Sequence, residues 1–482
     1  MPKKPRMLIR LNTRFALATA LSAAFAVAQE PIQFTTPDGS RFWLIAGDGP
    51  PIVHWAIASP CGVAVDPPTV PGLALACVIS SLRGTWHIGS LDEAREAATL
   101  AELDQAECDL AIAPQVNGVP PKALAERVAA LSAKAELTSD PQTFRRAMLS
   151  APASDIQVTT EGNAAVLSLS TTPAGTLAIA KLLVDRREGQ ALRSVRAIFE
   201  AGRSAATAAF DQDPFAPMRA EALALAYSGA ATARLGERPP NGGFSRALAQ
   251  SVFARTQHPT QTVHVLTGNF DVFVIRKTLE NAFVSTALPL PTVVTKAQPR
   301  TGTIMRRAVL PGAPHPMAVL AWPLRGNEPP DALACVVRWF ADGKDSWLGR
   351  ELQRLGHQQI QLRVLAPWPA PPDTGMLMIE ASDPFNGAPD LAAQILKLSQ
   401  AATQKVPREG ELALAYASWY ADWQRANSGA ASNARYLAAN LLSLPFGTAK
   451  ARPPADLGYE PLPAMLQQLL DSTPVVVEWK NP

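Results

Sequence analysis

Few residues of the kinds that do chemistry stand at a useful spacing in this chain. Two histidines four residues apart on one helix would share a face and could bind a metal. No two histidines have that spacing: they are His54, His87, His258, His264, His315 and His357. The sequence also lacks a G-x-S-x-G turn and a phosphate-binding glycine loop. The common hydrolase, nucleotide and metal chemistries are therefore not indicated by any motif.

The cysteines suggest no redox or zinc motif either. Cys61, Cys77, Cys108 and Cys335 form no C-x-x-C pair. Export would permit a disulfide between two of them, but a chain of this size does not need one to be stable. Buried free thiols are the favoured interpretation, and a disulfide remains the alternative.

The most informative stretch is Pro71–Thr85. It opens with Pro-Gly, carries no polar side chain from Leu73 to Ile79, and closes with Arg83-Gly84. A proline at the first helical position and a closing glycine predict a short helix beginning at Pro71. Its aliphatic side chains offer no lone pair to a metal, so we expect the helix to pack with its apolar face in the core.

The two ends of this stretch resemble those of the zinc helix in the insulinase (pitrilysin, mitochondrial processing peptidase) family of metallopeptidases. Gly72-Leu73-Ala74 and Arg83-Gly84-Thr85 stand at the family's spacing, and between them the inverted motif H-x-x-E-H falls on Leu75, Val78 and Ile79. The resemblance implies a degenerate, non-catalytic member without a catalytic or metal-binding residue at these positions. Glu200 is a possible counterpart of the family's third zinc ligand, a role that lapses without the histidines.

Further segments support the same resemblance. Val263–Asp271 looks like the family's closing strand, and Asp345–Leu352 matches a segment of its second domain. The resemblance implies an α+β fold of two homologous domains, each an antiparallel β-sheet backed by helices. We expect the N-terminal peptidase-like domain at 29–284, a linker rich in proline, threonine and valine at 285–300, and the C-terminal domain at 301–482. Near the start, Arg41–Ala46 and Ile52–Ala58 flank Gly47–Pro51, which predicts a hairpin.

Residues 1–28 have the pattern of a signal peptide. A basic front precedes an apolar run, and Ala26-Val27-Ala28 is a small-x-small site that predicts cleavage after Ala28. We expect a protein exported to the periplasm or beyond, with no membrane span in the mature chain. The whole chain is formally +3, and because the leader carries five basic and no acidic residues the remainder is −2. Nucleic-acid binding therefore loses its main support.

Active members of the family also carry an arginine and a tyrosine, seven positions apart, that meet the substrate from the second domain. Two alignments compete here. One places the pair on Gln353 and Ile360 and loses it, and the other places it on Arg350 and His357. Arg350, Arg354 and His357 are the candidate substrate-binding residues, although the two arginines also fit the exposed face of a short helix.

The resemblance implies a chain that does not hydrolyse peptides by itself. Small two-domain members of the family often work in pairs, so we expect an exported substrate-holding or chamber-forming subunit of a metalloendopeptidase, paired with a zinc-bearing homologue. No cofactor is expected in this chain, and zinc is expected only in the partner. The alternative is a purely structural or interaction protein with the peptidase fold. An enzyme with a displaced metal site is the third and least favoured reading.

Overall fold

The computed structural model describes residues 31–62, 65–117, 122–227, 237–238, 243–284, 306–311, 315–324, 330–368, 375–385, 390–405, 407–426, 429–443 and 461–480. The expected signal peptide (1–28) and linker (285–300) lie outside the described residues. Among the helices of the described ranges, none combines the length and apolarity needed to cross a membrane.

The first half of the chain builds a six-stranded sheet in the order β1-β2-β6-β3-β5-β4. β2 and β6 are parallel, and the other neighbouring strands are antiparallel. The strands are β1 (Ile32–Thr35), β2 (Arg41–Ala46), β3 (Val53–Pro60), β4 (Ser154–Glu161), β5 (Ala164–Thr171) and β6 (Val263–Gly268). The predicted hairpin is wrong, because Val265 of β6 pairs with Trp43 of β2 on one side and with Ala56 of β3 on the other. The late strand β6 lies between the two early ones, and Gly47–Pro51 crosses over it.

One face of this sheet is covered by helices of the same half. Phe42, Trp55 and Leu266 point into a core shared with α5 (Thr143–Ser150), α6 (Thr176–Glu188) and α10 (Val272–Ala282). Because side chains alternate along a strand, the residues next to them point to the opposite face. The other helices of this half are α2 (Leu73–Ser80), α3 (Glu93–Asn117), α4 (Lys122–Glu136), α7 (Val195–Gln212), α8 (Ala216–Ala226) and α9 (Arg246–Thr256).

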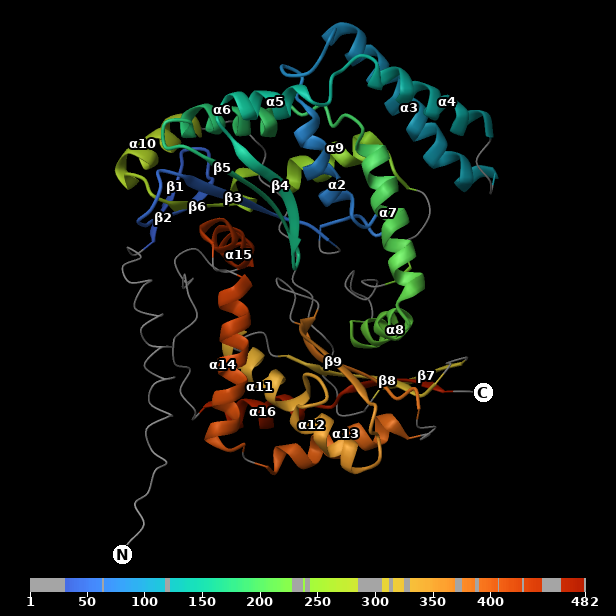
Figure 1. Ribbon diagram of the computed structural model, residues 1–482. Coiled ribbons are helices and arrows are strands. Elements are labelled where there is room, and N and C mark those ends of the chain that lie inside the picture. The colour runs from blue at the N-terminus through green and yellow to red at the C-terminus, as the bar shows by residue number, and fades with distance from the viewer. Residues whose placement is uncertain are drawn as a thin grey trace, which may run out of the picture.

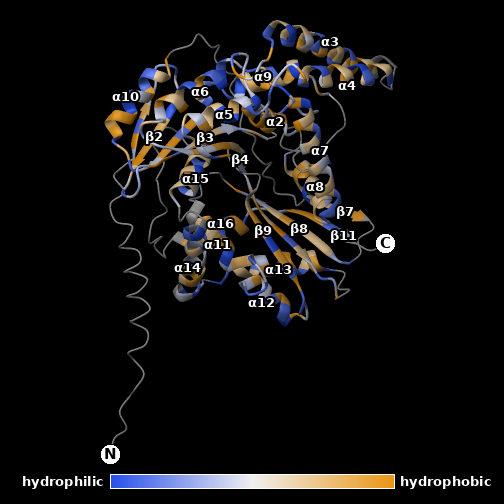
Figure 2. Cartoon of the chain, turned by 45° about the horizontal axis from the view of Figure 1, so that its top comes forward, coloured by the Kyte–Doolittle hydropathy of each residue, from blue (hydrophilic) through white to orange (hydrophobic). Residues whose placement is uncertain are grey.

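The second half repeats this topology with five strands in the order β7-β11-β8-β10-β9. Again one pair, β7 and β11, is parallel and the others are antiparallel. The elements are β7 (Arg306–Pro311), β8 (Met317–Pro323), α11 (Pro330–Ala341), α12 (Trp347–Arg354), β9 (Gln361–Trp368), β10 (Met376–Ser382), α13 (Leu391–Thr403), α14 (Glu409–Ala426), α15 (Ala430–Ser443), α16 (Pro461–Leu470) and β11 (Val475–Lys480). The predicted fold class of two homologous α+β units is therefore confirmed, with one parallel strand pair in each sheet. Figure 2 shows that many residues in the strands of both sheets are hydrophobic.

Each sheet receives one helix from the other half of the chain. Leu437 and Leu441 of α15 pack on the free face of the first sheet, against Trp43 and Ala56. Conversely, Leu223 of α8 belongs to the core on the free face of the second sheet. Figure 1 shows α15 beneath the first sheet and α8 above the second. The inner faces of the two sheets are thus covered by α15 and α8, each from the other half of the chain. We call α8 and α15 the exchanged helices.

Candidate functional site

The helix that carries the lost zinc positions begins later than predicted. α2 begins at Leu73, and Gly72 before it has a left-handed backbone with φ of 88°. The Asp66 carboxylate caps the helix by accepting hydrogen bonds of 2.7 Å from the backbone N–H groups of Gly72 and Ala74. Because Asp66 is buried, its pKa is raised to about 6 despite these hydrogen bonds. Asp66, seven residues before Leu73, therefore sets the start of the helix rather than Pro71.

The three motif positions on α2 do not share one environment. Val78 is 1% exposed and lies in the core with Cys77 and Leu73. Leu75 is only partly buried at the margin of that core, and Ile79 is 36% exposed. The expected burial of the helix is therefore wrong for Leu75 and Ile79, because the face formed by i and i+4 points outward while the i+3 position points inward. The two positions where the family's histidines would stand are accessible.

Glu200 lies on α7, a helix that packs against α2. Its neighbours Val195 and Phe199 on α7 are the residues that pack against α2. Glu200 instead forms ion pairs with Arg203 and with Arg196, whose Nη1 lies 3.9 Å from Oε1 of Glu200. Glu200 also lines a cavity between α7 and the helices α3 and α4. The carboxylate of Glu200 is thus engaged by two arginines of its own helix, and its assignment as a third-ligand counterpart stays a prediction.

Arg350 and Arg354 lie on the exposed side of α12. Arg350 donates to the backbone oxygen of Asp345 at 2.7 Å, and Arg354 donates to Glu351 at 2.6 Å. The apolar side of α12 packs with α11 and α13 on the helical face of the second sheet, which is opposite to the face that α8 covers. Figure 1 shows the same placement, with α12 on the far side of the second sheet from the first. The interpretation as an exposed helix face matches this geometry.

His357 is unavailable to a substrate. It is 1% exposed, and its Nδ1 lies 2.6 Å from Asp383 while its Nε2 lies 2.8 Å from Oε1 of Gln394. A buried imidazole with both nitrogens engaged is a structural residue, so its assignment as a substrate-binding residue is wrong. In the competing alignment Ile360 is a core residue and Gln353 only half-buried. Neither alignment therefore leaves an accessible arginine and tyrosine pair.

The remaining metal-ligand candidates are scattered. Within the described ranges, no group of three or more histidine, cysteine, aspartate or glutamate side chains is arranged to hold a metal ion. All four cysteines are free, and three are buried, which confirms the favoured interpretation. Burial raises the pKa of Cys61 to about 12 and that of Cys335 to about 11, so these thiols stay protonated and unreactive.

Strand β4 is a candidate binding element that was not predicted from the sequence. It is an edge strand that pairs only with β5 in the described part of the chain. Val158 of β4 packs against the same apolar cluster as Leu75 of α2. The alternation of Ile156 and Val158 with polar residues is the period-two signal that could have revealed it. An exposed strand edge offers backbone N–H and C=O groups to an added strand.

Two tandem copies of one mixed sheet, each with helices on the outer face and one exchanged helix on the inner face, define a duplicated α+β fold. Solved peptidase structures of the M16 class, the insulinase type, share it. A protease from Helicobacter pylori is 13% identical, with a TM-score of 0.64 over 94% of this chain and 100% of that one. The peptidase M16 inactive domain from Pseudomonas fluorescens is 12% identical, with a TM-score of 0.62 over 94% and 99%.

A chain of complex III2 from Candida albicans, solved with Inz-5 bound, has the same fold. It is 13% identical, with a TM-score of 0.57 over 93% of this chain and 95% of that one. No family model matches the sequence, and no curated protein matches it. At these identities the likeness shows the fold, and the resemblance predicted from Pro71–Thr85 is confirmed at that level. The protein has the two-domain M16 peptidase fold, with apolar residues at the motif positions of α2.

Proposed function

We propose that this chain is an exported, non-catalytic homologue of an insulinase-family zinc peptidase, and that it holds peptide as the subunit of a pair whose other member carries the zinc. The observation that carries the proposal is the outward face of α2. Leu75 and Ile79 occupy the accessible i and i+4 positions, so the helix presents an apolar surface where a zinc peptidase would present two ligands. The signal-peptide pattern of residues 1–28 supports export.

The edge strand β4 supports the peptide-holding role. An extended peptide that adds to this edge would gain main-chain hydrogen bonds, and its alternate side chains would meet the apolar surface of Leu75 and Ile79. Such binding depends on backbone groups and shape, so it needs no metal and tolerates many sequences. We assign no part of it to His357. Arg350 and Arg354 remain a secondary proposal, since their exposed guanidinium groups could meet a partner or an acidic peptide on the outer face of the second half.

The first experiment measures metal and activity in the isolated mature chain. We expect less than stoichiometric zinc by elemental analysis and no hydrolysis of unstructured peptides, with or without added zinc. About one tightly held zinc per chain, lost when a histidine is replaced, would contradict the non-catalytic assignment.

The second experiment tests pairing and substrate holding. Purification from the native source should recover a homologue that carries H-x-x-E-H, and the reconstituted pair should hydrolyse peptides. Peptide analogues N-methylated at alternate residues, on the face that would bond to β4, should bind at least about tenfold more weakly than the parent peptide. Arg350→Ala and Arg354→Ala, which lie away from β4, test the secondary proposal by their effect on turnover.

A purely structural role is the second candidate. The likeness to a chain of complex III2 favours it, because that chain is part of an assembly. A protein that purifies alone or in a complex without a zinc-bearing homologue, and that binds no peptide, would support this structural role and exclude the paired peptidase.

A further inference from the structure

A cavity of about 290 Å³ lies between the α3–α4 hairpin and the start of α7. Its walls are apolar, formed chiefly by Leu100, Leu103, Leu192 and Val195. The volume is about twice that of an apolar cavity that admits benzene, so it accommodates a hydrophobic side chain together with a polar head group. The wall combines fully buried residues with the exposed Glu136 and Ala197, so the cavity opens to solvent on their side.

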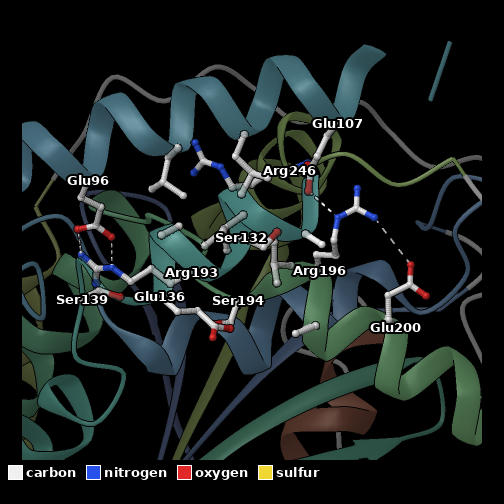
Figure 3. Close-up of a pocket in the computed structure, with 17 residues that line it drawn as sticks. Glu96, Glu107, Ser132, Glu136, Ser139, Arg193, Ser194, Arg196, Glu200 and Arg246 are labelled. Carbon is white, nitrogen blue, oxygen red and sulfur yellow. Dashed lines mark hydrogen bonds and ion pairs between the residues drawn. The ribbon is translucent and has the colours of Figure 1, made fainter. Parts of the chain in front are cut away.

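The arginines around the cavity are already paired. Arg193 forms a two-pronged ion pair with Glu96, Arg246 forms another with Asp104, and Arg196 donates to Glu107 at 2.6 Å. Figure 3 shows the Arg193–Glu96 and Arg196–Glu107 pairs at the two sides of the cavity, with Ser132 between them. These bridges fasten the α3–α4 hairpin to the rest of the first half and leave the space beneath it open. Their guanidinium groups are not free to bind a ligand.

Among the polar groups that line the cavity, three kinds have no partner in the described residues. The Ser132 hydroxyl is buried and neither accepts nor donates a hydrogen bond within the described residues. Glu136, the last residue of α4, has no ion pair in the described ranges. Ser194, the N-cap residue of α7, forms no side-chain cap, and the first turn of α7 has no acidic residue. Its backbone N–H groups at Arg196 and Ala197 find no acceptor in the same described part of the chain.

The charges of these unpaired groups are complementary to those of an amino acid. Uncapped N–H groups at a helix start bind a carboxylate, because they point at it and the helix dipole favours negative charge. A free carboxylate at a helix end binds an ammonium group, and the dipole at the C-terminus of α4 adds to the attraction. Glu136 and Ser194 border the same side of the cavity in Figure 3. An α-amino acid carries an ammonium and a carboxylate group on one carbon, so it matches the Glu136 carboxylate and the N–H groups at the start of α7.

The backbone at this point is also strained in the way that binding sites often are. Leu192 has φ of 48° and Ser194 has φ of 57°, both left-handed, and both residues line the cavity. Such conformations in non-glycine residues persist where the surrounding structure holds them. They place the start of α7 against the cavity rather than against solvent.

We propose that this cavity binds a free apolar α-amino acid, with its side chain among the leucines, its carboxylate at the N-terminus of α7 and its ammonium at Glu136. Ser132 offers a further hydrogen bond to the bound head group. A peptide terminus presents only one of the two charges and is disfavoured. The site is separate from α2 and β4, so it does not depend on the proposed peptide-holding function.

Titration calorimetry on the full mature chain with L-phenylalanine tests the proposal. We expect saturable one-to-one binding, at least about tenfold tighter than that of phenethylamine, 3-phenylpropionate, N-acetylphenylalanine or serine. Each comparison compound lacks one of the three recognised features. Absence of heat and of saturation transfer at 10 mM phenylalanine, or equal affinity for phenylalanine and phenethylamine, would overturn the assignment.

Two variants and a control locate the site. Ser132→Val fills part of the cavity and removes an unpaired hydroxyl, so it should weaken phenylalanine binding at least about tenfold without lowering the thermal midpoint. Glu136→Gln should weaken phenylalanine to a similar extent but leave 3-phenylpropionate unchanged. Glu126→Gln, on the same helix but 66% exposed and paired with Lys122, should change neither. Unaltered phenylalanine affinity in both Ser132→Val and Glu136→Gln would place the binding elsewhere and refute the proposal.

Discussion

At the residue scale, His264 gives the fold a defined response to acid. Its side chain is buried, the centroid of its ring lies 4.4 Å from that of Phe42, and its Nδ1 accepts a hydrogen bond from Nε1 of Trp55. Burial lowers the pKa of His264 to about 3. In the unfolded chain His264 binds a proton near pH 6.5, whereas in the folded chain it stays neutral at that pH. The free energy of unfolding therefore falls as the pH drops below 6.5.

We therefore expect His264 to contribute a loss of about 2 kcal/mol between pH 6.5 and pH 5. Urea unfolding across this range should show a flatter pH dependence for His264→Gln than for the parent.

The titration of Asp66 changes the stability in the opposite direction. Because its folded pKa is raised to about 6, the folded chain binds a proton that the unfolded chain does not, and stability rises as the pH falls from 6 towards 4. Asp66→Asn should steepen the acid loss; matching slopes in both variants and the parent would contradict these assignments.

The motif positions of α2 differ in how they tolerate the family's residues. Leu75→His together with Ile79→His should change the free energy of unfolding by less than about 1 kcal/mol, since both sites reach solvent. Adding Val78→Glu should lower it by a further 1–3 kcal/mol, roughly, because the carboxylate would be buried without a prepared partner. Urea denaturation of the double and triple variants measures the difference. Equal stability of the two would show that position 78 opens to solvent when substituted.

At the element scale, the α3–α4 hairpin depends on buried ion pairs more than on an apolar core. Its own cluster is small, built around Leu100, Leu103 and Val128. Glu96 and Arg193 are 1% and 4% exposed, so removing one leaves the other charged and desolvated. Such a loss destabilises a fold by about 3–5 kcal/mol.

Arg193→Met should therefore lower the free energy of unfolding by about 3 kcal/mol and raise hydrogen exchange in α3 before it does so in β3 or β5. Arg276→Met is the matched control, since its pair with Glu280 on α10 is exposed on both sides and contributes less than about 1 kcal/mol. A similar loss in the two variants would mean that the hairpin is not fastened through Arg193.

Most helices and strands could be predicted from the sequence, whereas the strands and side chains that they contact could not. β5 and the helices of the second half follow from apolar runs and caps, whereas α2 ends at Ser80 and Gly84 ends the short 3-10 turn Ser81–Arg83 that follows it. β4 was missed because both of its faces carry polar residues, as at Gln157 and Thr160. The false hairpin of β2 and β3 arose because local turn signals say nothing of a strand more than 200 residues later. The burial of His357 depends on Asp383 and Gln394, which its own segment does not reveal.

At the scale of the whole molecule, the exchanged helices couple the two halves. Arg219 of α8 donates to Glu380 of β10 at 2.6 Å, and Glu380 is 0% exposed. In the opposite direction, Leu441 of α15, from the second half, is buried against the first sheet. Neither half can therefore cover its own sheet on both faces.

We expect residues 31–284 expressed alone to be aggregated or to bind hydrophobic dyes, because the Trp43 face of the sheet would be uncovered. Coexpression with residues 301–482 should restore a soluble complex. The intact chain should unfold in one transition, and Leu441→Ala should increase hydrogen exchange in β3 although it lies in the other half. A soluble, two-state fragment 31–284 would show that the halves are independent.

The exchange of α8 and α15 between the two halves also sets the order in which the sheets can be covered while the chain is being synthesised. The first sheet has all its strands once β6 has been made, but the helix that shields its inner face is among the last segments to emerge. At ordinary translation speeds the nascent protein spends on the order of ten seconds with that face bare. On the proposal that this chain is exported, it must stay unfolded until it has crossed the membrane, and a first half that needs the later helix α15 to cover its sheet would be delayed in folding by its own topology.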